Sequence, residues 1–227
     1  MNKTPPAWSY SALKTYDTCP YKYAAERVTK EVKYSDSEAT IYGKELHLAC
    51  EEFIRDGKPL DPRFGFVLPY LEKLNNIPGE KICEMQVGLK KEDGRFVFCD
   101  FKDPSVWFRG VADLAIIDGT KGWLIDYKTN KNARYADPRQ LALMAACMFA
   151  RYPQLEKIKA GLLFVVSGDF VKSEYTRDKA YDIFADLHGL LTQREMSYNT
   201  NVWNPKPNGL CGKWCRATSC PHNGGDR

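Results

Sequence analysis

The sequence predicts an α/β protein in which helices flank a mixed central β-sheet. Two stretches with apolar residues at helical spacing, 37–57 and 138–151, enclose a run of strand-like segments between residues 84 and 128. The 227-residue chain is 44% hydrophobic, which is enough for a real core. We therefore expect one compact domain over residues 1–227.

The N-terminal part is expected to form a short helix and turn within residues 9–30. Ser9 can cap a helix, and the pair Cys19-Pro20 provides a break. A long amphipathic helix follows over 37–57, where apolar residues recur every three or four positions and the final glycine supplies a stop.

The middle of the chain changes to strand patterns after a proline-rich connection and a short helix near 67–74. The expected strands are 84–90, 95–101, 107–117 and 123–128. The link between the last two reads Asp-Gly-Thr-Lys-Gly, which is typical of a hairpin, so these strands should pair antiparallel.

The second half is expected to resume with a helix and to end in an irregular tail. The expected elements are a helix at 138–151, strands at 160–166 and 171–175, and a helix at 177–196. Beyond Ser197 the composition shifts to Asn, Pro and Gly, and three cysteines occur within ten residues. Such a tail has too little apolar content to fold alone and needs a staple.

Charge and composition narrow the class of protein. The net charge of +4 and the pI near 8.5 favour an anionic partner such as nucleic acid, although the excess is small. No stretch approaches the roughly 18 to 20 apolar residues of a membrane span, so we expect no membrane contact and a cytoplasmic location, or the host cytoplasm for a viral protein. Without a signal peptide, the eight cysteines indicate metal ligation or burial rather than disulfides.

The segment Gly122-Trp-Leu-Ile-Asp-Tyr-Lys-Thr129 is the most informative for chemistry. Side chains alternate along a strand, so Asp126 and Lys128 should point to the same side. The side chains of Trp123, Ile125 and Tyr127 would point to the opposite side of the strand, where helices can bury them. The charged pair is then directed at a cleft.

A second acid, Asp113, lies on the neighbouring strand. The alternation of Val111, Ala115 and Ile117 predicts an apolar residue at position 113. Because a buried lone carboxylate is costly, Asp113 should have a partner, and a divalent cation shared with Asp126 is the natural one.

His47 lies one turn after Gly43 in the helix expected at 37–57. The missing side chain at Gly43 would allow a close approach of another backbone or of a substrate, which makes a histidine ligand from this helix reasonable. Carboxylates favour Mg²⁺ or Mn²⁺, and a histidine shifts the preference toward Mn²⁺. Such a metal polarises a scissile phosphate, and a nearby lysine stabilises developing negative charge.

The order of these motifs, G-x-x-x-H, G-x-x-D and D-x-K followed by a helix, resembles the RecB-type branch of the PD-(D/E)XK nucleases. This branch includes the nuclease domains of RecB and AddAB, CRISPR-associated RecB-like exonucleases and many phage proteins, and the resemblance covers residues 9–220. It implies a restriction-endonuclease-like core. It also implies that His47, Asp113, Asp126 and the backbone carbonyl of Tyr127 bind Mg²⁺ or Mn²⁺ and that Lys128 is catalytic.

The family also carries a helical Gln-x-x-x-Tyr motif, in which Gln140 matches the first position and Met144 replaces the tyrosine. The resemblance implies that Gln140 positions DNA or the active site. The basic residues between the strand and this helix are Lys131, Arg134 and Arg139. They could contact phosphates or form a solvated basic loop. Glu84, which opens an expected strand, is a secondary site candidate or an ordinary surface residue.

The cysteines of the tail form a cluster with the spacing Cys-x3-Cys-x4-Cys. Its members are Cys211, Cys215 and Cys220, and Cys19 beside a proline is the expected fourth ligand. The arrangement resembles the [4Fe-4S] staple of family members whose spacing is Cys-x2-Cys-x5-Cys, and it implies a stapled cap formed by residues 1–30 and 197–227. A structural Zn²⁺ held by these thiols, or by three of them and His222, and unligated thiols are the alternatives.

The function expected from these residues is metal-dependent hydrolysis of DNA. Relatives suggest an exonuclease acting on single strands or DNA ends. One alternative is an endonuclease or end-processing subunit with protein partners in a recombination or CRISPR-type assembly. Another is a catalytically silent scaffold that binds DNA and carries a structural cluster.

Overall fold

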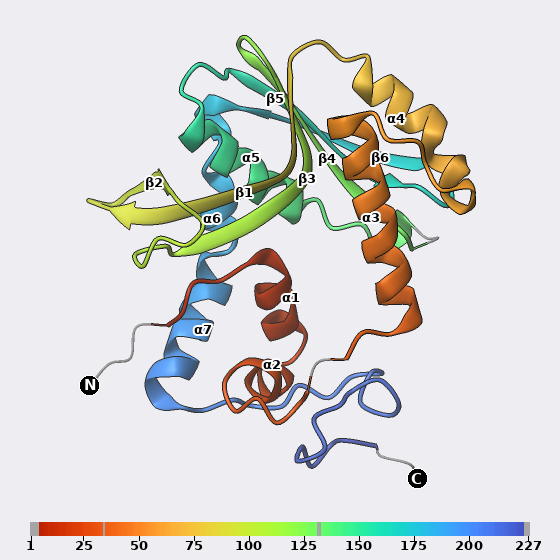
Figure 1. The fold of residues 1–227 in the computed structure, drawn as a ribbon. Helices are drawn as coiled ribbons and strands as arrows, with labels where there is room; N and C mark the ends of the chain where they lie inside the picture. Colours follow the sequence, from red (N-terminus) through yellow and green to blue (C-terminus); the bar gives the residue numbers. More distant parts are fainter. Residues whose placement is uncertain (1–4, 34, 131–132, 225–227) are drawn as a thin grey trace. The chain divides into compact units, whose positions relative to one another are not determined.

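The chain divides into two compact units. The computed structural model describes residues 5–33, 35–130 and 133–224 (Figure 1). Unit 1 joins Met1–Ser35 to Phe184–Arg227, and unit 2 is Asp36–Ile183. Residues from both ends of the chain thus share one unit, whereas unit 2 is continuous in sequence.

Unit 2 is built on a six-stranded sheet with the order β2-β1-β3-β4-β5-β6. Its strands are β1 (Glu80–Glu92), β2 (Arg95–Cys99), β3 (Phe108–Asp118), β4 (Lys121–Lys128), β5 (Lys157–Phe164) and β6 (Asp169–Thr176). Only β4 and β5 pair in parallel, and helix α5 (Arg139–Arg151) connects them, as a parallel crossover requires. The expected mixed α/β fold with an antiparallel hairpin of β3 and β4 is confirmed.

Helices cover the sheet of unit 2. Helix α3 (Glu38–Asp56) begins at Ser37, whose hydroxyl accepts a hydrogen bond from the Thr40 amide, and ends at Gly57 with φ 66°. It packs with the turn η1 (Pro62–Val67) and helix α4 (Leu68–Asn75) on residues of β3, β4 and β5 (Figure 1). Helix α5 packs on the surface of β4 that carries Gly122 and Asp126.

The single helix expected over 177–196 was wrong. The segment contains the turn η3 (Arg177–Lys179), helix α6 (Asp182–Asp186) and the start of helix α7 (His188–Thr200). The guanidinium of Arg177 donates hydrogen bonds to the carbonyls of Phe149, Tyr152 and Leu155, at 2.7 to 3.0 Å. This anchoring holds the start of the segment in a 3-10 turn. None of the described helices is long and apolar enough to cross a membrane.

Unit 1 contains helices α1 (Tyr10–Thr18), α2 (Pro20–Arg27) and α7, which confirms the short helix and turn expected near the N-terminus. Its core is aromatic and includes Tyr16 and Tyr23. Arg194 of α7 is 2% exposed and donates hydrogen bonds to the Tyr23 hydroxyl and the Pro6 carbonyl. Because both groups come from the N-terminal segment, this buried cation links the two ends of the chain.

Candidate active site

Three carboxylates form a row across three neighbouring strands. The register of β1 with β3 places Glu84 opposite Asp113. The ladder between β3 and β4 ends at Leu114 and Ile125, the neighbours in sequence of Asp113 and Asp126. Like charges directly opposite one another destabilise a sheet, so this row needs neutralisation by protons or by a cation.

The backbone of β1 is distorted at this row. Glu84 has φ 47°, a left-handed conformation that is uncommon for a residue other than glycine and that concentrates at functional sites. The neighbouring strand β3 also loses the regular alternation of its side chains between the two faces of the sheet. Leu114 packs in the core under α3, whereas Gly110 of the same strand lies against Met144 of α5.

Helix α3 brings a histidine to the row. The Nδ1 atom of His47 lies 3.3 Å from Oδ1 of Asp113. Ligand atoms of His47, Glu84 and Asp113 all lie within 4.8 Å of one another, and the described residues contain no other such trio of histidine, cysteine or acidic side chains. One nitrogen and two carboxylate oxygens at this spacing suit a divalent cation such as Mn²⁺ or Mg²⁺.

The trio attracts positive charge. Burial alone would lower the pKa of His47, but its hydrogen bond to Asp113 and the Asp113 charge raise it above the ordinary value. Burial and the Asp113 charge both raise the pKa of Glu84. Both side chains therefore hold a proton more tightly than usual, and a bound cation can take the place of that proton.

Asp126 and Lys128 form the second part of the site. The Lys128 ammonium forms an ion pair with Oδ2 of Asp126 at 2.5 Å. Burial and the Asp113 charge raise the pKa of Asp126 to about 6, and Lys128 opposes this rise. Gln140 of α5 donates to Oδ1 of Asp126 at 2.5 Å and accepts from Lys128 at 3.1 Å. The glutamine thus contacts both members of the pair.

The strands β3 and β4 separate where Asp113 and Asp126 lie. Oδ2 of Asp113 accepts the Tyr127 amide at 2.7 Å, a bond that takes the place of the missing ladder hydrogen bond. The Tyr127 ring lies in the core under α3, as expected, together with Ile125. This bond fixes Asp113 beside β4.

Two sequence expectations about this region need correction. Gly43 is not required for close backbone approach, since a β-carbon there would meet only the Thr129 side chain at an ordinary 3.5 Å. On β3, Leu114 and Ile116 are fully buried, whereas Ile117 is partly exposed. Ala115 is fully buried as well, so both faces of β3 carry buried apolar residues rather than the single face expected.

Glu84 lies closer to the centre of the site than the sequence indicated. Glu84 lies in the middle of β1 rather than at its start, and it joins His47 and Asp113 more closely than Asp126 does. Glu84 was only a secondary candidate from the sequence, because the residue type does not indicate the left-handed backbone that this glutamate adopts. The predicted side chains of His47, Asp113, Asp126, Lys128 and Gln140 otherwise all contact at least one other member of the set.

Two of the three basic residues that were expected to contact phosphates, Arg134 and Arg139, belong to the described residues. Arg139 makes a two-pronged ion pair with Asp137 at the start of α5. Arg134 is exposed in the turn η2 (Ala133–Tyr135), and Lys131 lies outside the described residues. Met144, at the position of the family's tyrosine, is 4% exposed and belongs to the core.

The trio opens onto a cleft of about 630 Å³. The helix α3 contributes Thr40, Gly43, Lys44, His47, Leu48 and Glu51, and the sheet side contributes Glu84, Val111, Asp113 and Thr129. Lys44 and Thr40 were not predicted as site residues. The signal that could have found them is their spacing of three and seven residues before His47, which places them on one helix face.

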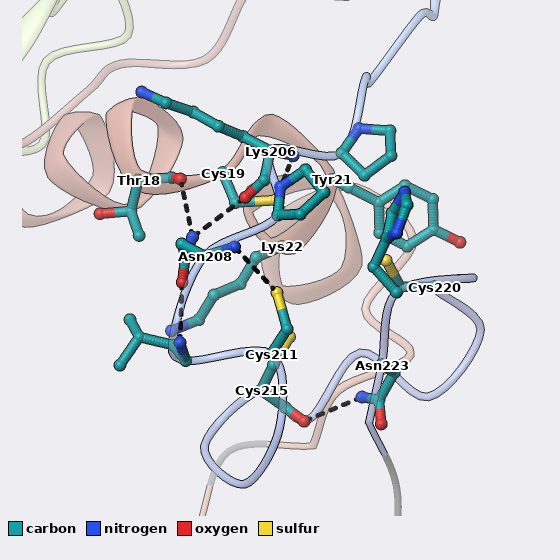
Figure 2. Close-up of a pocket in the computed structure, with 14 residues that line it drawn as sticks. Thr18, Cys19, Tyr21, Lys22, Lys206, Asn208, Cys211, Cys215, Cys220 and Asn223 are labelled. Atoms are coloured by element: carbon teal, nitrogen blue, oxygen red, sulfur yellow. Dashed lines mark hydrogen bonds between the residues drawn. The ribbon is translucent and has the colours of Figure 1, made fainter.

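The four predicted cysteines line one pocket in unit 1, together with His222 (Figure 2). Cys19 lies between α1 and α2, and its sulfur accepts a hydrogen bond from the Lys206 amide, while the Cys211 sulfur accepts one from the Asn208 amide. The described cysteines are all free thiols. Cys50, Cys99 and Cys147 are buried, and Cys83 is half-buried, consistent with their expected packing roles.

A mixed sheet that presents an acidic row and a lysine on adjacent strands is the arrangement of the restriction-endonuclease-like proteins. The sequence matches the PD-(D/E)XK nuclease superfamily over residues 7–223, and the chain belongs to this superfamily. No curated protein matches it. A solved structure from Eubacterium rectale, described as a "putative exonuclease", is similar in fold, with 13% identity, a TM-score of 0.50, and coverage of 93% of this chain and 88% of that chain. The crystal structure of SSO0001 aligns with 14% identity, a TM-score of 0.48, and coverage of 97% and 89%.

Proposed function

We propose that the protein is a metal-dependent deoxyribonuclease that acts as an exonuclease on single-stranded DNA or on DNA ends. The observation that carries the proposal is the acidic row Glu84–Asp113–Asp126, which is flanked by His47 and Lys128. Membership in a nuclease superfamily supports the reaction class, and the fold of the Eubacterium rectale protein agrees with it.

The proposed metal ligands are His47, Glu84 and Asp113, with Asp126 and the backbone carbonyl of Tyr127 completing the site. When bound, Mg²⁺ or Mn²⁺ would polarise the scissile phosphate and lower the pKa of a water. The raised pKa values of Glu84 and Asp126 support this assignment, because burial and a neighbouring carboxylate disfavour their charged forms unless a cation neutralises them.

The residues of this chain have distinct roles in the proposal. The ammonium of Lys128, 2.5 Å from Asp126, is placed to stabilise negative charge that develops on the phosphate. Gln140 holds Asp126 and Lys128 in position through one hydrogen bond to each. Asp113 is oriented by the Tyr127 amide, so that its other oxygen faces His47.

The proposal is tested with purified protein and end-labelled DNA. We expect cleavage of linear single strands with Mg²⁺ or Mn²⁺ and none with EDTA, because the acidic row alone repels phosphate. A circular single strand of the same sequence should stay intact. Cleavage of the circle would show an endonuclease instead, and DNA binding without cleavage in either metal would show a silent scaffold.

We further propose that Cys19, Cys211, Cys215 and Cys220 hold a [4Fe-4S] cluster that ties the ends of the chain together. The four thiols line one pocket, although Cys19 lies far from the other three in the sequence, and this convergence supports a shared metal centre. The amide hydrogen bonds to the sulfurs of Cys19 and Cys211 also suit charged thiolates.

Anaerobically purified protein is expected to absorb visible light and to contain about four iron atoms per chain. Cys215→Ser should lose the iron and unfold at a lower temperature, because the tail around it has little apolar core. Cys83→Ser, which lies in unit 2, is the control and should keep both iron and colour. Stoichiometric zinc without iron in the wild type would overturn the cluster assignment.

A further inference from the structure

The face of α3 that lines the cleft differs in charge from end to end. Glu51 follows His47 by one turn, and Lys44 precedes it by one turn. Glu51 is paired with Arg55 outside the cleft lining. The catalytic trio thus has an acidic neighbour on one side along the helix and a basic neighbour on the other.

Charge decides where a DNA strand can leave the trio. The described residues that line the cleft include the acids Glu51, Glu84 and Asp113, and Lys44 is the one lysine or arginine among them. A phosphodiester chain is repelled by the acids wherever no cation neutralises them. This repulsion favours the side of Lys44.

Lys44 is already bound to an anion of the protein. Its ammonium contacts the two carboxylate oxygens of Asp36 at 2.9 and 2.7 Å. The Lys44 side chain is 59% exposed, so this is a solvent-facing ion pair of the kind that contributes little to stability. A phosphate offers the same oxygen ligands and could replace the carboxylate.

We propose that Lys44 binds the backbone phosphate next to the scissile one, that the bound strand runs from His47 toward the N-terminal end of α3, and that Asp36 competes for Lys44. This inference rests on the proposed nuclease function. Lys44 precedes His47 by three positions, about 4.5 Å along the helix axis, so its long side chain can reach a phosphate next to the one held at the trio. Thr40 and Thr129 line the same part of the cleft and offer hydroxyls to the backbone.

The proposal predicts opposite effects for the two partners of the ion pair. Lys44→Met should raise KM for a single-stranded substrate about tenfold and leave kcat nearly unchanged. Asp36→Asn should lower KM about threefold, because it removes the competing anion. The dependence of DNA affinity on salt should fall by about 0.7 in log-log slope for Lys44→Met, the value of one phosphate contact to a single strand.

Lys58→Met is the matched control. Lys58 lies just beyond the other end of α3, is also 59% exposed, and pairs with Glu52 at 2.6 Å. This variant should change neither KM nor the salt slope. If Lys44→Met also left both unchanged, or if Asp36→Asn raised KM as Lys44→Met does, the proposed strand path would be overturned.

Binding and cleavage are measured separately so that the two levels of proposal can be distinguished. Fluorescence anisotropy of a labelled oligonucleotide is recorded with Ca²⁺ in place of Mg²⁺, so that a cation neutralises the acids while binding is measured. A wild type that cleaves no DNA with Mg²⁺ or Mn²⁺ contradicts the nuclease proposal. A wild type that cleaves DNA, together with a Lys44→Met variant of unchanged affinity, contradicts the strand path alone.

Discussion

Asp126→Asn is expected to reduce the rate of DNA cleavage by about 10³-fold or more, the largest effect of any single substitution we predict. The amide keeps the shape of the carboxylate and can still contact Gln140, but it carries no charge to hold a divalent cation. The rate is measured in single-turnover assays over a range of Mn²⁺ concentrations, so that weaker metal binding and a slower chemical step are distinguished.

The melting temperature of Asp126→Asn distinguishes a loss of catalysis from damage to the folded core. The raised pKa of Asp126 means that the folded protein disfavours the charged form. Removing that charge should therefore leave the melting temperature of the metal-free protein at neutral pH equal or higher. Asp118→Asn, at the exposed end of β3, is the control and should cleave DNA at the wild-type rate. Cleavage by Asp126→Asn at that rate would refute the active-site assignment.

Lys128→Met is expected to lower kcat about 10²-fold to 10³-fold, because it removes a positive charge from the place where negative charge develops. The substitution keeps most of the side-chain volume. Metal affinity should change less than kcat, since Lys128 is not a proposed ligand. Isothermal titration with Mn²⁺ and steady-state kinetics measure the two quantities on the same samples.

Lys121→Met is the matched control for this prediction because it lies at the opposite, exposed end of β4. It should leave kcat within about twofold of the wild type. A Lys128→Met variant with normal kcat and a raised KM would instead indicate that the lysine binds DNA in the ground state and takes no part in the chemical step.

The elements with strong local signals were predicted from the sequence. Helix α3 has a serine cap, a regular apolar stripe and a terminal glycine, and each of these is a local feature of the chain. The hairpin of β3 and β4 has a distinctive turn, and it fixes the pairing that brings Asp113 beside Asp126. Strand alternation then placed Asp126 and Lys128 correctly on one side.

The parts that failed depend on tertiary contacts. The left-handed backbone at Glu84 is imposed by its surroundings in the sheet, so its approach to His47 could not be read from the residue type. The break before α6 depends on carbonyls of distant residues that bind Arg177. The role proposed for Lys44 depends on the acids that α3, β1 and β3 together bring to the cleft, which the helical spacing of Lys44 and His47 does not show.

The division of the chain has a consequence for biosynthesis. Unit 2 is continuous, so a growing polypeptide has all of its residues once position 183 has left the ribosome. Unit 1 cannot close until its second segment, which begins at Phe184, has also emerged. Its early helices α1 and α2 must therefore wait, with their aromatic faces unpaired, while the whole sheet is made. Cys19 can meet Cys211, Cys215 and Cys220 only after residue 220 has emerged, so assembly of the proposed cluster would follow synthesis of all of unit 2.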